Sequence, residues 1–303
     1  HWTITNGLLF AVLWLLPRRW WPALFAATVA ARIVNGVATY TLSGISGPFL
    51  GYWSDPLQFV LGNVLEPFLV VTGVLALRAW RVLPSTPVTS RTIGLLHIAA
   101  AISATAVVAK DLVYVFNDGF IADVRRGIVF NPVPLGGPGS WDLLGAFAIK
   151  NALGTFIGIM LVAPLACWMA TPRNRQGSSM ILRSALRYLL PTLTMYVLLA
   201  ASTPGSQFAE LLRLLLMSAA VVFAMRHGWR GAAMSVLAAS LAIAVEDHLG
   251  GSLYSPVWLQ LFIAITGAMA LLFGAAIDNL REQSALLSRA HRQSAQLAEE
   301  LRA

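Results

Sequence analysis

The sequence predicts an all-α membrane protein, a polytopic transmembrane helix bundle of about nine spans whose last helix continues into water. Three observations predict this class. The 303 residues are 57% hydrophobic and 11% charged, with a mean hydropathy of +0.71, whereas soluble domains carry about 25% charged residues. Apolar runs of about 20 residues, the length that crosses a bilayer as a helix, recur along the chain. The last run passes into a polar stretch without a Gly, a Pro or a turn cluster between them.

The order of apolar runs and chain breakers places each span. The connectors that separate them read, in chain order, "PRRW", "TLSGISGPFLGYWSD", "RAWRVLPSTPVTSR", "NDGFIADVRRGIVFNPVPLGGPGSWD", "RNRQGSSMILRSALR", "STPGSQ", "RHGWR" and "EDHLGGSLYSPV". These connectors are polar or rich in Gly and Pro, which end apolar helices. We expect helices at residues 4–16, 21–41, 56–79, 91–116, 142–169, 185–201, 205–225, 230–249 and 257–277.

The distribution of arginine predicts the orientation. Alternate connectors and the C-terminal stretch hold most of the basic residues, while the connectors of the other side hold only Arg125 and Arg126. Basic residues collect on the cytoplasmic side, so we expect a multi-pass membrane protein with a cytoplasmic C-terminus. His1 would then face outward, and we expect at least one further span upstream. Because the basic clusters lie between apolar runs, they indicate topology rather than a nucleic-acid surface.

The polar C-terminal stretch divides the chain into a transmembrane domain at 1–277 and a candidate signalling helix at 278–303, the start of a coiled coil. Candidate seam positions recur every seven residues, at Leu280, Leu287, Ser294 and Leu301. Such a spacing is typical of a coiled coil, so we expect a homodimer through this helix. The alternative is a solvated helical extension. An output domain would follow, because such a helix needs something attached to it.

One polar group falls near the middle of the predicted bundle. "LGNVLEPF" puts Asn63 and Glu66 on one helix face, and Arg32 lies at a similar depth in the preceding span. Charged groups at mid-membrane cost about 2.5–3.5 kcal/mol on insertion scales, so each needs a partner or a role. These residues could bind a ligand or relay protons, or they could form an interhelical hydrogen-bonded pair.

A second polar group gathers toward the outer side. Both signs of charge recur on four predicted helices, at Lys110, Asp111, Lys150, Asn151, Glu210, Arg213, Glu246, Asp247 and His248. An outward-open polar cavity for a small polar or anionic ligand would explain this pattern. Separate ion pairs that tie helices together would explain it equally well.

No pattern of catalysis is present in the sequence. There is no nucleophile elbow, HExxH or P-loop, the histidines lack metal-ligand spacing, and Cys167 is the one cysteine. We therefore expect no catalytic residues, no metal and no cofactor in this chain. Gly154 and Gly158 in "GTFIG" form a small-xxx-small pair that permits close helix contact.

Several segments, taken in order, resemble the first type of membrane-associated sensor domain, the MASE family. They are "LPRRWWPALFAATVAARIV", "GNVLEPFLVVTGVLALRAW", "ALGTFIGIMLVAPLACW", "RHGWRGAAMSVLAASLAIA" and "LQLFIAITGAMALLFGAAIDNLRE". The latter half is most similar to hexose-phosphate-uptake sensor kinases. The family's GNxxE pattern falls on Gly62, Asn63 and Glu66, whereas Asn151 stands where the family's later pattern has an acid.

This resemblance implies a sensory input module joined to a cytoplasmic histidine kinase of a two-component system, or in other members to a diguanylate cyclase. It also implies a response regulator downstream and a transporter-like membrane partner as a possible source of the signal. A secondary transporter, with the outer cavity as its substrate site, is the rival from another class. Membrane lipid surrounds the chain in either case.

Overall fold

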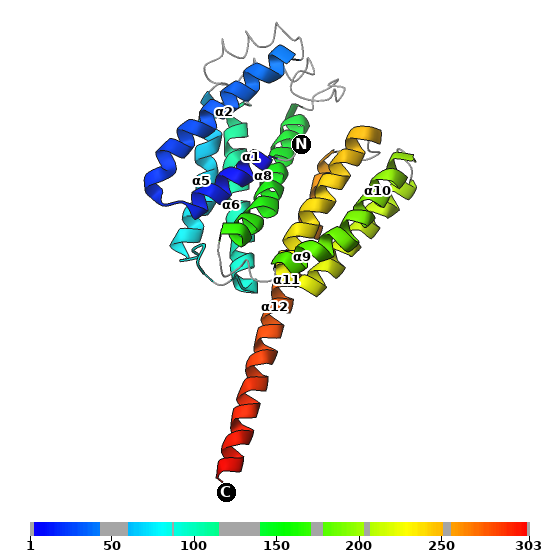
Figure 1. The fold of residues 1–303 in the computed structure, drawn as a ribbon. Helices are drawn as coiled ribbons and strands as arrows, with labels where there is room; N and C mark the ends of the chain where they lie inside the picture. The colour runs from blue at the N-terminus through cyan, green and yellow to red at the C-terminus, as the bar shows by residue number, and fades with distance from the viewer. Residues whose placement is uncertain are drawn as a thin grey trace. The chain divides into compact units, whose positions relative to one another are not determined.

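The computed structural model describes residues 3–42, 60–86, 88–114, 140–170, 178–202, 207–250 and 256–301, and the regular structure in these ranges is helical (Figure 1). The all-α class is therefore confirmed. The elements are α1 (Ile4–Leu15), η1 (Arg18–Trp20), α2 (Trp21–Leu42), η2 (Val60–Leu65), α5 (Glu66–Ala79), α6 (Ser90–Tyr114), α8 (Ser140–Ala170), α9 (Ser178–Ser184), η4 (Ala185–Leu189), α10 (Leu190–Ser202), α11 (Gln207–Gly250) and α12 (Pro256–Glu300).

Helices long and apolar enough to cross a membrane are present in the described part. Four qualify by length and composition, at Ser90–Lys110, Ala148–Ala170, Leu211–Glu246 and Val257–Glu300, and Ile4–Leu15 is a shorter apolar helix. The order of helices is the predicted one, while the count of nine spans stays a prediction.

One predicted boundary was wrong by several residues. The helix expected to begin at residue 185 begins at Ser178 and passes through the π-helical turn η4 into α10. The apolar run marks the hydrophobic stretch of a helix rather than its end. Ser178–Ser184 includes Met180, Leu182 and Arg183, which are good helix formers, so the helix starts within the polar connector.

The chain divides into two compact units, and the first comprises His1–Ser85, Leu95–Asn174 and Tyr254–Ala264. Within it α1 packs on α8 and on α5. The α1–α8 contact depends on Gly7 and Gly158, because a methyl group on Gly7 would overlap the Gly158 carbonyl and one on Gly158 would overlap the Thr3 carbonyl. The Thr3 amide also donates to the Gly154 carbonyl at 3.3 Å. The close contact predicted from "GTFIG" is therefore confirmed.

A buried serine joins α5 to α6 in the same unit. Ser103 Oγ accepts a hydrogen bond from the Gly73 amide at 3.1 Å and donates to the Val70 carbonyl at 2.8 Å. A methyl group on Gly73 would overlap the Ala99 carbonyl, so the two helix backbones lie close together. Small residues at the contact allow this approach, as is usual between membrane helices.

The second unit comprises Thr86–Gly94, Arg175–Leu253 and Ile265–Ala303. Its main feature is α11, which folds back on itself at Gly228, where φ is 66° and ψ is −155°. Residues on either side of this turn face each other: Ser235 Oγ donates to the Ala220 carbonyl at 3.2 Å, and Arg213 pairs with Glu246. The residues 207–227 and 229–250 are therefore two antiparallel arms, which confirms the break predicted between residues 225 and 230.

The last helix, α12, runs from Pro256 to Glu300 without interruption. At about 1.5 Å per residue such a helix is roughly 70 Å long, more than twice the ~30 Å of a hydrocarbon core. Its apolar first part contributes Ile263, Ala270 and Leu271 to the buried core, whereas residues 280–301 are exposed at every position. Figure 1 shows this continuous helix in orange and red, ending at the C mark.

Candidate functional site

The best-defined polar site centres on Glu66, the first residue of α5. The π-helical turn η2 directly precedes it and carries Asn63. π-helical turns widen a helix locally and are frequent at functional sites. Asn63 and Glu66 are both 8% exposed, so the two residues that the sequence placed on one helix face lie inside the first unit.

Three side chains from three other helices hold the Glu66 carboxylate. Its Oε1 accepts from Asn6 Nδ2 of α1 at 2.8 Å and from the Arg32 guanidinium of α2 at 3.0 Å. Its Oε2 accepts from Lys110 Nζ of α6 at 2.7 Å. We call Asn6, Arg32, Glu66 and Lys110 the Glu66 cluster. The cluster ties four helices together through one carboxylate.

The described side chains of the Glu66 cluster carry more positive than negative charge. Its described side chains include two cations and a single carboxylate, and the side chains of Arg32, Glu66 and Lys110 are 17%, 11% and 4% exposed. Charge in a region of low dielectric is costly unless it is paired. The cluster therefore favours negative charge near Arg32 and Lys110, a demand that Glu66 meets from within the protein.

A pocket of about 730 Å³ lies beside this cluster. Its lining combines polar with aliphatic side chains from α1 and its N-cap, α2, η2, α5 and α8: Thr3, Thr5, Leu8, Leu9, Val12, Leu24, Ala27, Thr28, Ala31, Arg32, Asn63, Glu66 and Asn151. Binding sites for small molecules are typically clefts of this size with a few convergent polar groups. The pocket brings together four residues that the sequence assigned to two different sets, Arg32, Asn63 and Glu66 from one and Asn151 from the other.

The structure revises the place of Lys110. The sequence grouped it with Lys150 and Asn151 in an outer set, apart from Glu66, but Lys110 pairs with Glu66 directly. Depth along a span, estimated from the ends of an apolar run, does not resolve one helical turn. A lysine side chain extends over more than that, so its ammonium group can reach a carboxylate on a neighbouring helix.

A second buried cluster lies between the arms of α11 and α10, in the other unit. Arg213 Nε donates to Glu246 Oε2 at 2.9 Å, and its NH2 donates to Oε1 at 2.7 Å. Tyr196 of α10 donates its hydroxyl to Oε2 at 3.0 Å. Tyr196, Arg213 and Glu246, the Glu246 cluster, are at most 4% exposed. This two-pronged pair is balanced in charge, as a structural tie between helices requires.

Other predicted residues lie elsewhere or cannot be placed. Lys150 is half-buried on α8. The side chains of Asp111, Glu210, Asp247 and His248 fall outside the described residues. Among the described residues no three His, Cys, Asp or Glu side chains gather as a metal site would need. Lys110 and Arg213 therefore belong to separate ion-paired clusters, each within its own unit.

Sequence reasoning missed two participants. Asn6 is fully buried and was the one amide in an otherwise apolar first run, which is the signal that could have identified it. Tyr196 carries no such signal, because tyrosine is common in membrane helices and only its contact with Glu246 distinguishes it.

The candidate seam positions of α12 are open to a partner. Leu280, Leu287 and Leu301 are 63%, 72% and 89% exposed, and Ser294 is exposed as well. The exposed leucines are consistent with a seam, which stays a prediction.

Residues 138–281 match the model of the MASE1 family. These residues are a MASE1 domain, a membrane-associated sensory domain. The chain is thus an integral membrane protein with a sensory domain, as the sequence resemblance indicated. No curated protein and no solved structure matches the chain.

The MASE1 match covers α8 through the start of the exposed part of α12. It includes the Glu246 cluster, the turn at Gly228 and the residues Asp278 to Arg281. Arg32, Glu66 and Lys110 precede the matched residues. The cluster with the adjoining pocket therefore combines Asn151 of the MASE1 domain with side chains from the preceding helices.

Proposed function

We propose that this chain is the input module of a sensor histidine kinase in the bacterial inner membrane. The pocket beside the Glu66 cluster would detect a small polar or anionic ligand, or a membrane partner would act on the bundle. Helix α12 would transmit the signal to a kinase domain in the cytoplasm, and a response regulator would receive the phosphoryl group.

The observation that carries this proposal is the continuity of α12. One helix begins among buried apolar residues and continues, unbroken, to positions that are exposed on all sides. A small displacement of its first part would be passed along the backbone hydrogen bonds to its last turn. A sensory domain needs such a connection between its interior and an output.

MASE1 domains are found in histidine kinases and in diguanylate cyclases. The similarity of the latter half to hexose-phosphate-uptake sensor kinases favours kinase output here. A diguanylate cyclase attached to the same helix is the alternative. Two assays on the full-length protein, one for phosphotransfer and one for cyclic-dinucleotide synthesis, decide between a kinase and a cyclase output.

The transmission step can be tested by disulfide crosslinking in membranes that contain the full-length protein with Cys167→Ser. Single cysteines at Leu280, Gln283, Ser284, Leu287 and Ala290 report the seam, and cysteines at Glu282 and Arg289 are off-seam controls. We expect crosslinks between copies with a seven-residue period. Uniform or absent crosslinking would reject the dimeric signalling helix, and solute uptake into liposomes would then test the transport alternative.

The ligand step needs its own measurement. Thermal unfolding of the purified protein can be followed with succinate, inorganic phosphate or glucose 6-phosphate, and with glucose as the neutral control. A ligand that binds the folded state raises the unfolding temperature. We expect an anion to do so in the wild type but not in Asn151→Leu, which removes a pocket amide outside the Glu66 cluster. If no anion stabilises the protein, signal detection through a membrane partner is favoured.

A further inference from the structure

The place where α12 leaves the buried core coincides with the turn of the α11 hairpin. Gly274 of α12 faces the backbone of Gly228 and Trp229, and a methyl group on Gly274 would lie 2.7 Å from the Gly228 carbonyl oxygen. One turn later, α12 reaches its first charged residues, Asp278 and Arg281. The two helices therefore touch at the only described position where α11 has left-handed backbone geometry.

The α11 turn leaves polar groups of the backbone without helical partners. In a continuous helix the Met225 carbonyl would accept from the Trp229 amide. At this turn the first arm ends in carbonyls that need donors, and the second arm begins with amides that need acceptors. A hairpin turn without satisfied ends would be unstable.

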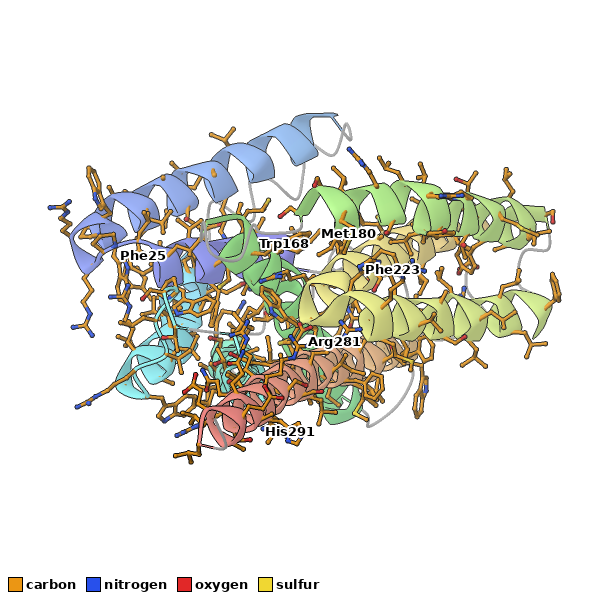
Figure 2. The ribbon with its side chains drawn as sticks, turned by 60° about the horizontal axis from the view of Figure 1, so that its bottom comes forward. Phe25, Trp168, Met180, Phe223, Arg281 and His291 are labelled. Atoms are coloured by element: carbon orange, nitrogen blue, oxygen red, sulfur yellow. The ribbon has the colours of Figure 1, made fainter. Side chains whose placement is uncertain are left out.

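Two residues of α12 supply both kinds of partner. Asp278 Oδ2 accepts from the Trp229 amide at 3.1 Å. Arg281 donates to the Met225 carbonyl at 2.8 Å and to the Arg226 carbonyl at 3.3 Å. We call these contacts the Asp278–Arg281 clamp. Figure 2 labels Arg281 on α12, as well as Phe223 in the arm that the guanidinium caps.

The signs of these charges match the helix ends that they contact. A carboxylate favours the positive N-terminal end of a helix, and a guanidinium favours the negative C-terminal end. Asp278 lies at the start of the second arm and Arg281 at the end of the first. The two side chains also lie 3.7 Å from each other, three residues apart. Exchanging the two charges would place each beside the wrong helix end.

A third contact fixes the same turn of α12. Asn279 Nδ2 donates to Ser90 Oγ, at the start of α6, at 2.7 Å. Beyond Arg281 the residues of α12 are exposed. The clamp and this hydrogen bond are therefore the last described hydrogen bonds that α12 makes with other segments of the chain.

We propose that the Asp278–Arg281 clamp is the coupling contact of the sensor: it holds α12 at one axial and rotational position against the α11 turn, and signalling proceeds by its release. This inference rests on the proposed function and names its regulation. A helix displaced by even one residue, about 1.5 Å and 100°, would carry both charges away from the helix ends. The clamp thus gives the last helix two distinct states, as a two-state switch requires.

The clamp lies within one chain, so hydrogen–deuterium exchange of the full-length protein can test it without reference to a dimer. Asp278→Ala and Arg281→Met are the test variants, and Glu282→Ala and Arg289→Met, on exposed positions of the same helix, are the matched controls. We expect amide exchange at residues 226–232 to rise on the order of tenfold in the test variants, since charged hydrogen bonds are lost. The controls should exchange like the wild type.

The regulatory claim is tested by kinase output and by the crosslinking profile of α12. We expect both test variants to shift basal output, whereas the control variants keep it. The double exchange Asp278→Arg with Arg281→Asp keeps the net charge and the mutual ion pair, and we expect it to fail to restore output.

Two results would overturn the clamp. If exchange rises while output and crosslinking stay at wild-type values, the contacts merely cap a turn. If the double exchange restores output, the mutual pair matters and the helix ends do not. Wild-type crosslinking without a seven-residue period would instead reject the proposed function, and the exchange data would still report whether the clamp forms.

Discussion

Replacement of Glu66 by glutamine gives the sharpest stability prediction. The substitution keeps the size of the side chain but removes the one carboxylate that the described cluster places between Arg32 and Lys110. Arg32 and Lys110 then lose this ion-pair partner. Removing one partner of a buried ion pair costs about 3–5 kcal/mol. We expect the free energy of unfolding of Glu66→Gln to fall by that amount.

The pairing of Glu66 with Lys110 can be isolated by a double-mutant cycle. Lys110→Met leaves Glu66 paired with Arg32 and Asn6, so we expect a smaller loss of about 1–3 kcal/mol. In the double variant the Lys110 ammonium, which Glu66→Gln deprives of this carboxylate, is absent as well. The free energy of unfolding of the double variant should therefore fall by less than the sum of the two single losses. The difference should be roughly 0.5–3 kcal/mol, the usual coupling of residues in one network.

The measurement is denaturant-induced unfolding in mixed micelles, followed by the fluorescence of the tryptophans. Glu282→Gln on the exposed part of α12 is the matched control, and we expect it within about 0.5 kcal/mol of the wild type. Additive losses in the cycle would contradict the contact between Glu66 and Lys110. A wild-type stability for Glu66→Gln would contradict the burial of the charges.

Three further substitutions test other contacts by the same unfolding measurement. The free energy of unfolding of Gly158→Ala should fall by about 1–3 kcal/mol because the added methyl group meets backbone atoms next to α1. Gly145→Ala is the control, because Gly145 on the same helix has open space around it, and its stability should be unchanged or rise by up to ~1 kcal/mol. Equal values for both variants would refute the close contact. Arg213→Met should lose about 3–5 kcal/mol, and adding Glu246→Gln should recover part of it. The free energy of unfolding of Gly228→Ala should fall by about 1–3 kcal/mol or more, because the backbone conformation at this position is nearly restricted to glycine. An unchanged stability would show that the α11 turn is not as described.

The sequence predicted the helices well because apolar runs and polar connectors are local features. The break in α11 was expected from "RHGWR", where basic residues and a glycine interrupt two apolar runs, and the structure places the turn at Gly228. The continuity of α12 was expected from the absence of breakers, and it extends to Glu300. The helix that begins at Ser178 shows the limit of this reasoning, since helical propensity continues where hydropathy ends.

The partners within the polar sites could not be predicted in the same way. Glu66 and Lys110 are 44 residues apart in the sequence, so their contact depends on how α5 packs on α6. Nothing in a single sequence reports that packing directly. Asp278 was equally hidden, because an acid just after an apolar run is expected to be solvated. Its contact with Trp229 becomes visible only when the α11 turn is placed beside it.

The two buried clusters differ in a way that assigns them different roles. Glu246 is held by a two-pronged Arg213 and by Tyr196, so its charge is balanced and its oxygens are occupied. Apolar replacements of similar shape can preserve such a tie. Glu66 instead shares two cations and lines a pocket, where an anionic ligand could change the balance of charge among four helices. A signal needs a site whose occupancy alters the energy of the bundle, and we propose the Glu66 cluster because an anion in the adjoining pocket would compete with Glu66 for Arg32.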